Sequence, residues 1–182
     1  KHGNGVSHGA ASSDASQGLT VVRVALPTSS NVPDWEIDDR PFHVALSGLD
    51  IEWSQPLWND PGVEWADYDA VLIRTTWDYQ YNCDQFLEWV DTVSHKTTLH
   101  NDGRIIRWNA EKTYLRELES FGAALAPTLW LSKGSDVSLQ DLMIRHDWRR
   151  GFLKPVVGAT ARETHRFEVG TEYTRRCGYE IY

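Results

Sequence analysis

Short apolar runs without polar alternation are the feature that most limits how this chain can fold. The first run, LTVVRVALP at residues 19–27, is rich in β-branched side chains and closes at a proline. A second run, Ala70 to Ile73, lies inside YDAVLIRTTWDY at residues 68–79. Both runs have the length of a strand, and their continuous apolar character is typical of strands buried on both faces of a parallel sheet.

The segment between these runs predicts a short helix and an edge strand. Pro41 suits the first turn of a helix, and Gly48 can end that helix in a left-handed cap. The residues of this helix that are expected to face inward are Phe42, Ala45 and Leu46. IEWSQPLW at residues 51–58 reads as the next strand, and its internal Pro56 restricts it to a sheet edge or a strand end.

A longer helix is predicted after the second apolar run. Asn82 is a suitable N-cap, and Gln85 three residues later completes a capping box. The expected buried face of this helix comprises Phe86, Trp89, Val90 and Val93. The alternation of strands and helices over residues 19–100 predicts an α/β domain with a mainly parallel sheet.

A second unit is predicted over residues 101–182. Its first helix, residues 110–121, takes Asn109 as N-cap and stops at Gly122. The apolar stripe of that helix comprises Tyr114, Leu115, Leu118 and Phe121. The other elements expected in this unit are a strand at residues 126–131, a helix at about 137–147, and the strand GFLKPVV at 151–157.

Composition excludes several classes of protein. With 182 residues, of which 41% are apolar and nine are tryptophan, the chain can bury a core. Its net charge of −8 argues against binding to nucleic acid or to an anionic membrane. No apolar run approaches the ~20 residues that cross a bilayer, so a cytoplasmic protein is expected. Residues 1–18 are expected to form a disordered leader, and Cys83 and Cys177 to be reduced thiols without metal-ligand spacing.

Lys112 falls in the first turn of the predicted helix at residues 110–121. A cation at that end of a helix is disfavoured by about 0.3 to 1 kcal/mol because of the macrodipole. It becomes favourable when an anion such as phosphate binds there, because the exposed N–H groups and the ammonium then share one partner. The alternative is a solvated lysine that happens to lie early in the helix.

Lys154 lies at the end of a predicted strand and precedes a loop of small residues. A cation fixed by a strand, followed by Gly158, Ala159 and Thr160, has the components of a phosphate clamp, because small residues let backbone N–H groups approach oxygens closely. The pattern differs from a P-loop, whose lysine follows the glycine loop. A structural or solvated lysine at a strand edge is the alternative.

Taken together, the two lysines and the motifs around them resemble the ATP-grasp superfamily, in its group related to glutathione synthetase and cycloserine-forming ligases. The motifs that carry the resemblance are RTTWDY (74–79), RWNAEKTYL (107–115), PTLW (127–130) and FLKPVVGATARET (152–164). They occur in the family's order and at suitable spacing over about residues 21–168. The resemblance implies a pre-ATP-grasp domain at residues 19–100, followed at 101–182 by the first, incomplete part of an ATP-grasp nucleotide-binding domain.

The resemblance also assigns roles to individual residues. Lys112 and Lys154 match the two lysines that contact ATP phosphates from opposite sides of the nucleotide cleft. Gly158, Ala159 and Thr160 match the small-residue loop that closes over the transferred phosphate. Four residues just past the carboxyl end of a predicted strand, where open α/β sheets gather ligands, are candidates for the wall of the acceptor-substrate site: Arg74, Thr75, Trp77 and Asp78.

Structural alternatives stand beside the acceptor-site assignment. Trp77 and Tyr79 can simply cover the sheet end, and Arg74 with Asp78 can form a structural ion pair. The acidic residues that precede the first predicted helix are expected to be solvated, although this stretch faces the same sheet edge and could meet a substrate amino group. They are Asp34, Glu36, Asp38 and Asp39.

The chain departs from the family's pattern after the second lysine. A complete ATP-grasp enzyme continues to an adenine hinge and to acidic and Asn ligands for magnesium, none of which can be assigned here. We therefore expect the N-terminal part of an ATP-dependent carboxylate–amine ligase that acts through an acylphosphate and is inactive as this chain alone. ATP is the expected cofactor, Mg²⁺ is expected for the complete family enzyme, and the substrate is expected to be a small carboxylate or amino acid.

Two other classes of function stay open at this stage. One is a noncatalytic nucleotide-binding or partner-binding module derived from the ATP-grasp fold, and the other is an unrelated α/β nucleotide-dependent transferase. Uncovered sheet edges and apolar faces in the second unit predict self-association, with a homodimer as the expected form.

Overall fold

Four short parallel strands form the centre of the first unit in the computed structural model, which describes residues 21–31 and 38–170. They are β1 (Val22–Ala25), β2 (Ile51–Ser54), β3 (Ala70–Leu72) and β4 (Thr98–His100). The spatial order is β2-β1-β3-β4, and each neighbouring pair is parallel. The predicted parallel α/β arrangement is confirmed, and β2 lies at a sheet edge as its following proline indicated.

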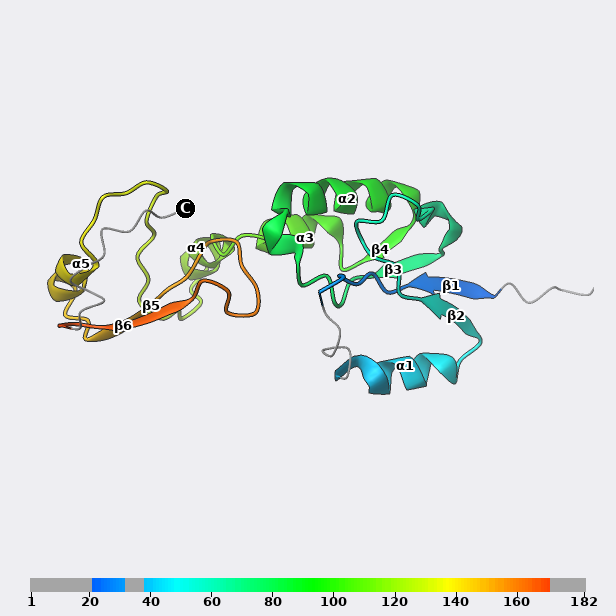
Figure 1. Cartoon of the computed structure of the whole chain (residues 1–182), viewed down its shortest axis with the longest axis horizontal. Coiled ribbons are helices and arrows are strands. Elements are labelled where there is room, and N and C mark those ends of the chain that lie inside the picture. The colour runs from blue at the N-terminus through cyan, green and yellow to red at the C-terminus, as the bar shows by residue number, and fades with distance from the viewer. Residues whose placement is uncertain (1–20, 32–37, 171–182) are drawn as a thin grey trace, which may run out of the picture.

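Helices lie on both sides of this sheet (Figure 1). The short helix α1 (Arg40–Ser47) is on one side, and α2 (Cys83–Lys96) and α3 (Gly103–Asn109) are on the other. The face of α2 that was predicted to be buried is confirmed at all four positions. Together with the sheet and the preceding loop it forms the main core of Ala25, Trp58, Trp65, Val71, Phe86, Trp89, Val90, Val93 and Ile106.

The two faces of the sheet differ in how completely they are covered. Of the run predicted to be fully buried, only Val71 is fully buried, and it faces the aromatic core below α2. Leu72 alternates to the other face, which α1 covers less completely, and it is half-buried. Ala45 of α1 is exposed rather than inward-facing, whereas Leu46 is buried and Phe42 is half-buried. The ring of His43 stacks on Trp53 of β2, whose indole N–H donates to Ser47 Oγ at 3.2 Å, and these contacts join α1 to the sheet.

The helix caps differ from the sequence expectation in two places. Gly48 ends α1 with φ −87° and ψ −3°, so the predicted left-handed cap is wrong. Asn82 is the N-cap residue of α2, but its side chain makes no capping hydrogen bond, and its φ of −145° and ψ of 58° follow from the 3₁₀ turn η3 (Tyr79–Tyr81) that leads directly into α2. The predicted capping box is therefore absent.

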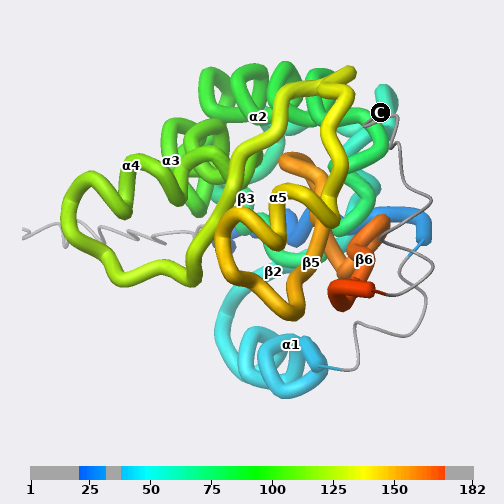
Figure 2. Tube along the Cα trace, turned by 90° about the vertical axis from the view of Figure 1, so that its left-hand side faces the viewer, coloured from blue at the N-terminus to red at the C-terminus, as the bar shows by residue number. Residues whose placement is uncertain are grey.

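A smaller second unit follows, built from α4 (Tyr114–Ser120), α5 (Leu139–Arg145) and an antiparallel pair, β5 (Arg150–Leu153) and β6 (His165–Glu168). Its own core has three buried residues, which are Leu139, Met143 and Phe167. In Figure 2 this unit faces the viewer, with α5, β5 and β6 in front of the parallel sheet. The loop at residues 154–164 joins the two strands and returns toward the first unit.

Several expectations for this unit are corrected by the structure. The helix predicted at 110–121 begins only at Tyr114, because Asn109 is the last residue of α3, a helix that the pattern did not predict. Phe121 is 78% exposed and follows α4 rather than packing beneath it. Residues 126–131 form no strand, since a β-type pattern becomes a strand only where a neighbour supplies the hydrogen-bond ladder.

Three expectations concern residues outside the described ranges. They are the disordered leader at residues 1–18, the acidic residues Asp34 and Glu36, and the thiol of Cys177. Within the described ranges no helix combines the length and the apolar character needed to cross a bilayer, and the longest, α2, has 14 residues.

Gly103 allows α2 and α3 to approach closely, which generates a stability prediction. A Cβ at this position would lie 2.8 Å from Ser94 Oγ and 3.2 Å from Val90 Cγ1. We expect Gly103→Ala to lower the free energy of unfolding by about 1 to 3 kcal/mol because the helices must separate, measured by urea denaturation.

Two further variants control this experiment. Gly48→Ala should change stability little, because its Cβ would have ordinary contacts, the nearest at 3.4 Å, and its φ is negative. Ser94→Ala combined with Gly103→Ala should recover part of the loss. Equal effects of G103A and G48A would show that the close helix contact is not the cause.

Candidate functional site

Lys112 lies between α3 and α4 and forms hydrogen bonds with the loop that joins β5 and β6. Its backbone N–H donates to the Val156 carbonyl at 2.9 Å, and its ammonium donates to the Gly158 carbonyl at 2.9 Å and to Val156 O at 3.4 Å. Lys112 precedes α4 by two residues instead of lying in a first helical turn. Lys112 is therefore outside the first turn of α4, and loop carbonyls set the position of its ammonium.

The electrostatic setting of Lys112 is unfavourable for a free cation. Partial burial lowers the pKa of its ammonium, and repulsion from Lys154 lowers that pKa further. Two of the three ammonium donors point at carbonyl oxygens of the loop. A bound anion would relieve the repulsion between the two lysines.

Lys154 directly follows β5 and contributes the second cation. Its Nζ lies 5.6 Å from the centroid of the Phe152 ring, and Phe152 is itself 63% exposed. Because β5 ends at Leu153, the residues 155–157 that were predicted as strand belong to the loop. The structure thus brings together two lysines that are 42 positions apart in the sequence, next to the same small-residue loop.

The small-residue loop at Gly158 lies close to Lys112 and to the first unit. A Cβ at Gly158 would lie only 3.0 Å from Pro155 Cγ, so the absence of a side chain lets the loop fold back tightly on Pro155, whereas Lys112 Nζ would be at an ordinary contact distance of 3.6 Å. The backbone N–H of Ala159 donates to Oε1 of Gln80, a residue of the first unit. Thr160 is exposed and has a positive φ of 53°.

Arg74 leaves the carboxyl end of β3 and pairs with Asp39, which precedes α1. The guanidinium donates to both carboxylate oxygens, at 2.9 and 2.5 Å, and lies 4.7 Å from the Phe42 ring centroid. This hydrogen bonding with Arg74 lowers the pKa of Asp39 against the opposing effect of burial. The expected Arg74–Asp78 pair and the solvated state expected for Asp39 are both wrong, because Asp39 is only 8% exposed.

The other residues of RTTWDY are held by internal hydrogen bonds. The Thr75 hydroxyl is buried and donates to Thr28 Oγ1 at 2.9 Å. The indole N–H of Trp77 donates to the Arg74 carbonyl at 3.0 Å, and Asp78 accepts a hydrogen bond of 2.6 Å from the indole of Trp58. Trp77 and Asp78 are half-buried and lie past the carboxyl end of β3. Thr75 lies there as well, but its side chain is buried.

Sequence reasoning missed Gln80 and Tyr81, the two residues of η3 that contact the loop of the second unit. Gln80 accepts from Ala159, and Arg162 lies over the Tyr81 ring at 4.6 Å. These contacts join positions about 80 residues apart in the chain, and no local pattern marks them. The sequence contains only an indirect indication of their role, since they directly follow the candidate site segment RTTWDY.

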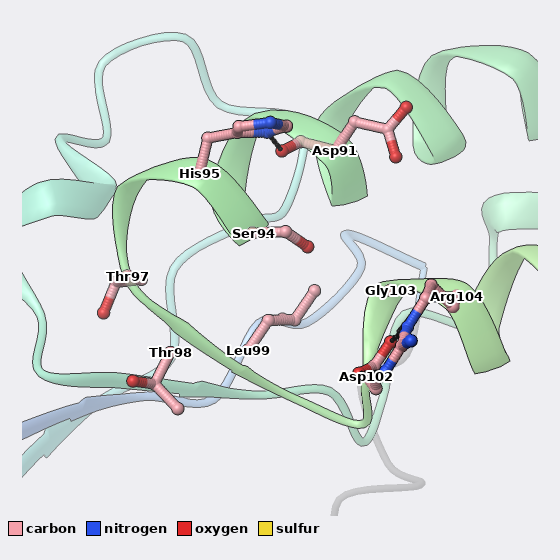
Figure 3. A pocket seen from close by; sticks show the side chains of 9 residues that line it. All are labelled: Asp91, Ser94, His95, Thr97, Thr98, Leu99, Asp102, Gly103 and Arg104. Carbon is pink, nitrogen blue, oxygen red and sulfur yellow. Dashed lines mark hydrogen bonds and ion pairs between the residues drawn. The ribbon is translucent and has the colours of Figure 1, made fainter.

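A separate open pocket of ≈ 560 Å³ lies where the end of α2 meets β4 and the start of α3 (Figure 3). None of the predicted site residues lines it. Its two carboxylates already have partners, since Asp91 pairs with Arg107 and Asp102 pairs with Arg104 at 2.9 Å. We assign no function to this pocket.

Comparison with known proteins identifies the class to which the first unit is related. Residues 24–101 match the family model described as D-cycloserine synthetase DcsG, N-terminal domain. The matched segment spans β1 to β4 and includes the sheet edge with Arg74 to Asp78. The first unit is therefore homologous to the N-terminal domain of a synthetase.

Two individual proteins extend the comparison. The cycloserine biosynthesis protein DcsG of Streptomyces lavendulae is 31% identical over 114 residues, which are 61% of this chain and 38% of that protein. The crystal structure of D-cycloserine synthetase DcsG superposes with a TM-score of 0.73 and 28% identity, over 80% of this chain and 50% of the other. The chain thus spans about half or less of the length of these relatives.

The Arg74–Asp39 pair generates a prediction for stability against pH. Because its pKa in the folded protein is lowered, Asp39 stabilises the fold above the ordinary carboxyl pKa, and this contribution is lost as pH falls through the lowered value. Asp39→Asn should lower the free energy of unfolding by about 1 kcal/mol at pH 7, given the partial exposure of Arg74. The difference from the unmodified protein should shrink below about pH 4, measured by urea denaturation across pH.

Glu64→Gln is the matched control, because Glu64 pairs with Lys96 at the exposed surface. Its effect at pH 7 should be smaller than that of Asp39→Asn. A D39N effect that does not change with pH would contradict the assignment of the ion pair as its source.

Proposed function

We propose that this chain supplies phosphate-binding residues and the acceptor-side domain of an ATP-dependent carboxylate–amine ligase of the ATP-grasp type. The observation that carries the proposal is the Lys112 ammonium held at the Gly158 carbonyl, with Lys154 near enough to lower the pKa of that ammonium. The homology of residues 24–101 to a synthetase domain supports it independently. ATP, when bound, would supply the phosphoryl group that activates a carboxylate as an acylphosphate, which an amine then attacks.

The two lysines fit the charge that such a reaction requires. Phosphoryl transfer is accelerated by cations and N–H donors held in place around the phosphates. Carbonyls at 156 and 158 orient the Lys112 ammonium and leave one donor for a phosphate oxygen. Lys154 adds a second cation from the end of β5. In this proposal the loop at Gly158, Ala159 and Thr160 covers the phosphates.

The acceptor substrate is proposed to bind at the sheet edge beside this loop. Arg74, Trp77 and Asp78 lie past the carboxyl end of β3, the end at which open α/β sheets bind ligands. A small carboxylate or amino acid matches their mixed charge and apolar surface. Within residues 21–31 and 38–170 no group of three or more His, Cys, Asp or Glu side chains is placed to hold a metal ion, and we assign no magnesium ligand among them.

A noncatalytic nucleotide-binding or partner-binding module is the second candidate. The observation that favours it is that the Lys112 ammonium and the Ala159 N–H already have intramolecular partners. A module of this kind would bind nucleotide or a partner protein without turnover. Product formation from ATP, a carboxylate and an amine by a protein that contains this chain would decide for the ligase.

Removal of either lysine tests the phosphate assignment. We expect Lys112→Ala and Lys154→Ala each to weaken binding of a non-hydrolysable ATP analogue with Mg²⁺ at least about tenfold, since each deletes a charge-assisted contact. Isothermal titration calorimetry on the full chain measures this. Lys133→Ala, in an exposed turn, is the matched control. Unchanged affinity in both site variants would exclude these lysines from the nucleotide site.

The lowered pKa of Lys112 predicts a pH dependence of nucleotide binding. Only the protonated ammonium attracts phosphate, so affinity should fall as pH rises through a value below 10.5, the ordinary lysine pKa. Lys154→Ala removes the repulsion and should move this fall to higher pH, although the affinity itself is lower. An inflection at the same pH in the unmodified protein and in K154A would contradict the coupling of the two lysines.

A further inference from the structure

The loop between β5 and β6 contacts the first unit at one short turn. That turn is η3 (Tyr79–Tyr81), which lies between the sheet edge and the start of α2. The residues that meet it are Ala159 and Arg162, from the middle of the loop. Two successive residues of the turn, Gln80 and Tyr81, therefore contact two loop residues that are three positions apart in the sequence.

Gln80 makes the polar contact. Its side-chain oxygen accepts the backbone N–H of Ala159. A Cβ built on Gly158 would lie 3.9 Å from this oxygen and 3.6 Å from Lys112 Nζ, so the amide oxygen and the ammonium both lie next to Gly158. Gln80 thus contacts the segment whose carbonyls orient Lys112.

Tyr81 makes the second contact. The Arg162 guanidinium lies 4.6 Å from the centroid of the Tyr81 ring, within the range of a cation–π interaction. Tyr81 is 57% exposed, so the ring is a surface platform and not part of the core. Arg162 also pairs with Glu163 at 2.5 Å, which restricts its orientation over the ring.

The loop backbone needs outside support to keep its shape. Thr160, Ala161 and Glu163 all have positive φ, between 52° and 57°, although none of them is glycine. Non-glycine residues adopt this region at a cost, and they keep it where surrounding contacts fix the chain. The contacts of Ala159 with Gln80 and of Arg162 with Tyr81 flank Thr160 and Ala161, and Glu163 directly follows the second contact, so the two contacts provide that restraint.

We propose that Gln80 is a positioning residue that holds the loop at residues 158–162 against the first unit. Gln80 follows Asp78, the last residue of the candidate acceptor wall, by two positions. Docking at Gln80 therefore places the proposed phosphate-side loop next to the segment that carries the proposed acceptor wall. This inference rests on the proposed function for its catalytic meaning, whereas the docking itself is a property of the fold.

The chemistry of the amide explains how substitutions separate these roles. Gln80→Ala deletes the acceptor and frees the Ala159 N–H. Gln80→Glu keeps an acceptor at the same place but adds a negative charge near the Lys112 ammonium. Glu should therefore preserve docking of the loop while competing with phosphate oxygens for the lysine, an effect that a purely structural residue would not produce.

Hydrogen–deuterium exchange of the full chain tests the docking. We expect Gln80→Ala to speed exchange of amides 158–163 about tenfold, while Q80E stays within about threefold of the unmodified protein. Gln85→Ala, at an exposed position in the first turn of α2, is the matched control. It should leave the exchange rates of amides 158–163 and of the α2 peptides unchanged. Peptides from α2 report whether each variant remains folded. Equal loop exchange in Q80A and in the unmodified protein overturns the inference.

Arg162→Ala keeps the test decisive if Q80A also loosens α2. This variant removes the second contact from the loop side and should again speed exchange of amides 158–163. If Q80A turns out to be unfolded, the single variant R162A decides instead. Loop exchange in R162A equal to that of the unmodified protein then overturns the inference.

Titration with the ATP analogue and Mg²⁺ separates this inference from the proposed function. Q80A should bind about three- to tenfold more weakly, the loss expected for one hydrogen bond, and Q80E more weakly still because of its charge. If the unmodified protein binds no analogue while Q80A loosens the loop, the docking stands and the proposed function fails. If the unmodified protein binds the analogue, and both Q80A and Q80E bind it with the same affinity as the unmodified protein, the positioning role is overturned.

Discussion

The packing of α2 on the parallel sheet is the interaction on which the rest of this structure depends. Val71 on β3 and Val90 and Val93 on α2 are fully buried, and a cluster of tryptophans and Phe86 fills the space around them. This contact fixes the start of α2, and with it the turn η3 immediately before the helix. Because η3 carries the residues that contact the distant loop, the hydrophobic core of the first unit also sets the position of the lysine-bearing site.

The charged groups of the site fall into two kinds. Arg74 and Asp39 form a bidentate pair with good geometry, which makes that corner of the sheet stable and keeps the carboxylate ionised. Lys112 and Lys154 are like charges brought near each other, with Lys112 partly buried, an arrangement that disfavours the folded state. Perturbed electrostatics of this kind are often found at functional sites, and the proposed function pairs the two lysines with the phosphates of ATP.

The sequence predicted the first unit more completely than the second. The buried face of α2 repeats over about two turns, so Phe86, Trp89, Val90 and Val93 were identifiable from periodicity alone. Strand β4 and helix α3 have only three and seven residues, too few for a clear pattern. In the second unit a local apolar pattern at 126–131 met no partner strand, and the helix expected at 110 was displaced because α3 extends to Asn109.

The sequence by itself determined the parallel α/β fold, because short continuous apolar runs and an amphipathic helix have few other ways to bury their surfaces. It also placed Lys112, Lys154 and the Gly158 loop among the residues of interest. Only the tertiary structure decided that the Lys112 ammonium binds the loop carbonyls, that Asp39 is the partner of Arg74, and that Gln80 holds Ala159. The physical reason is that these are single contacts between segments 35 to 79 residues apart, and such contacts leave no periodicity in the sequence.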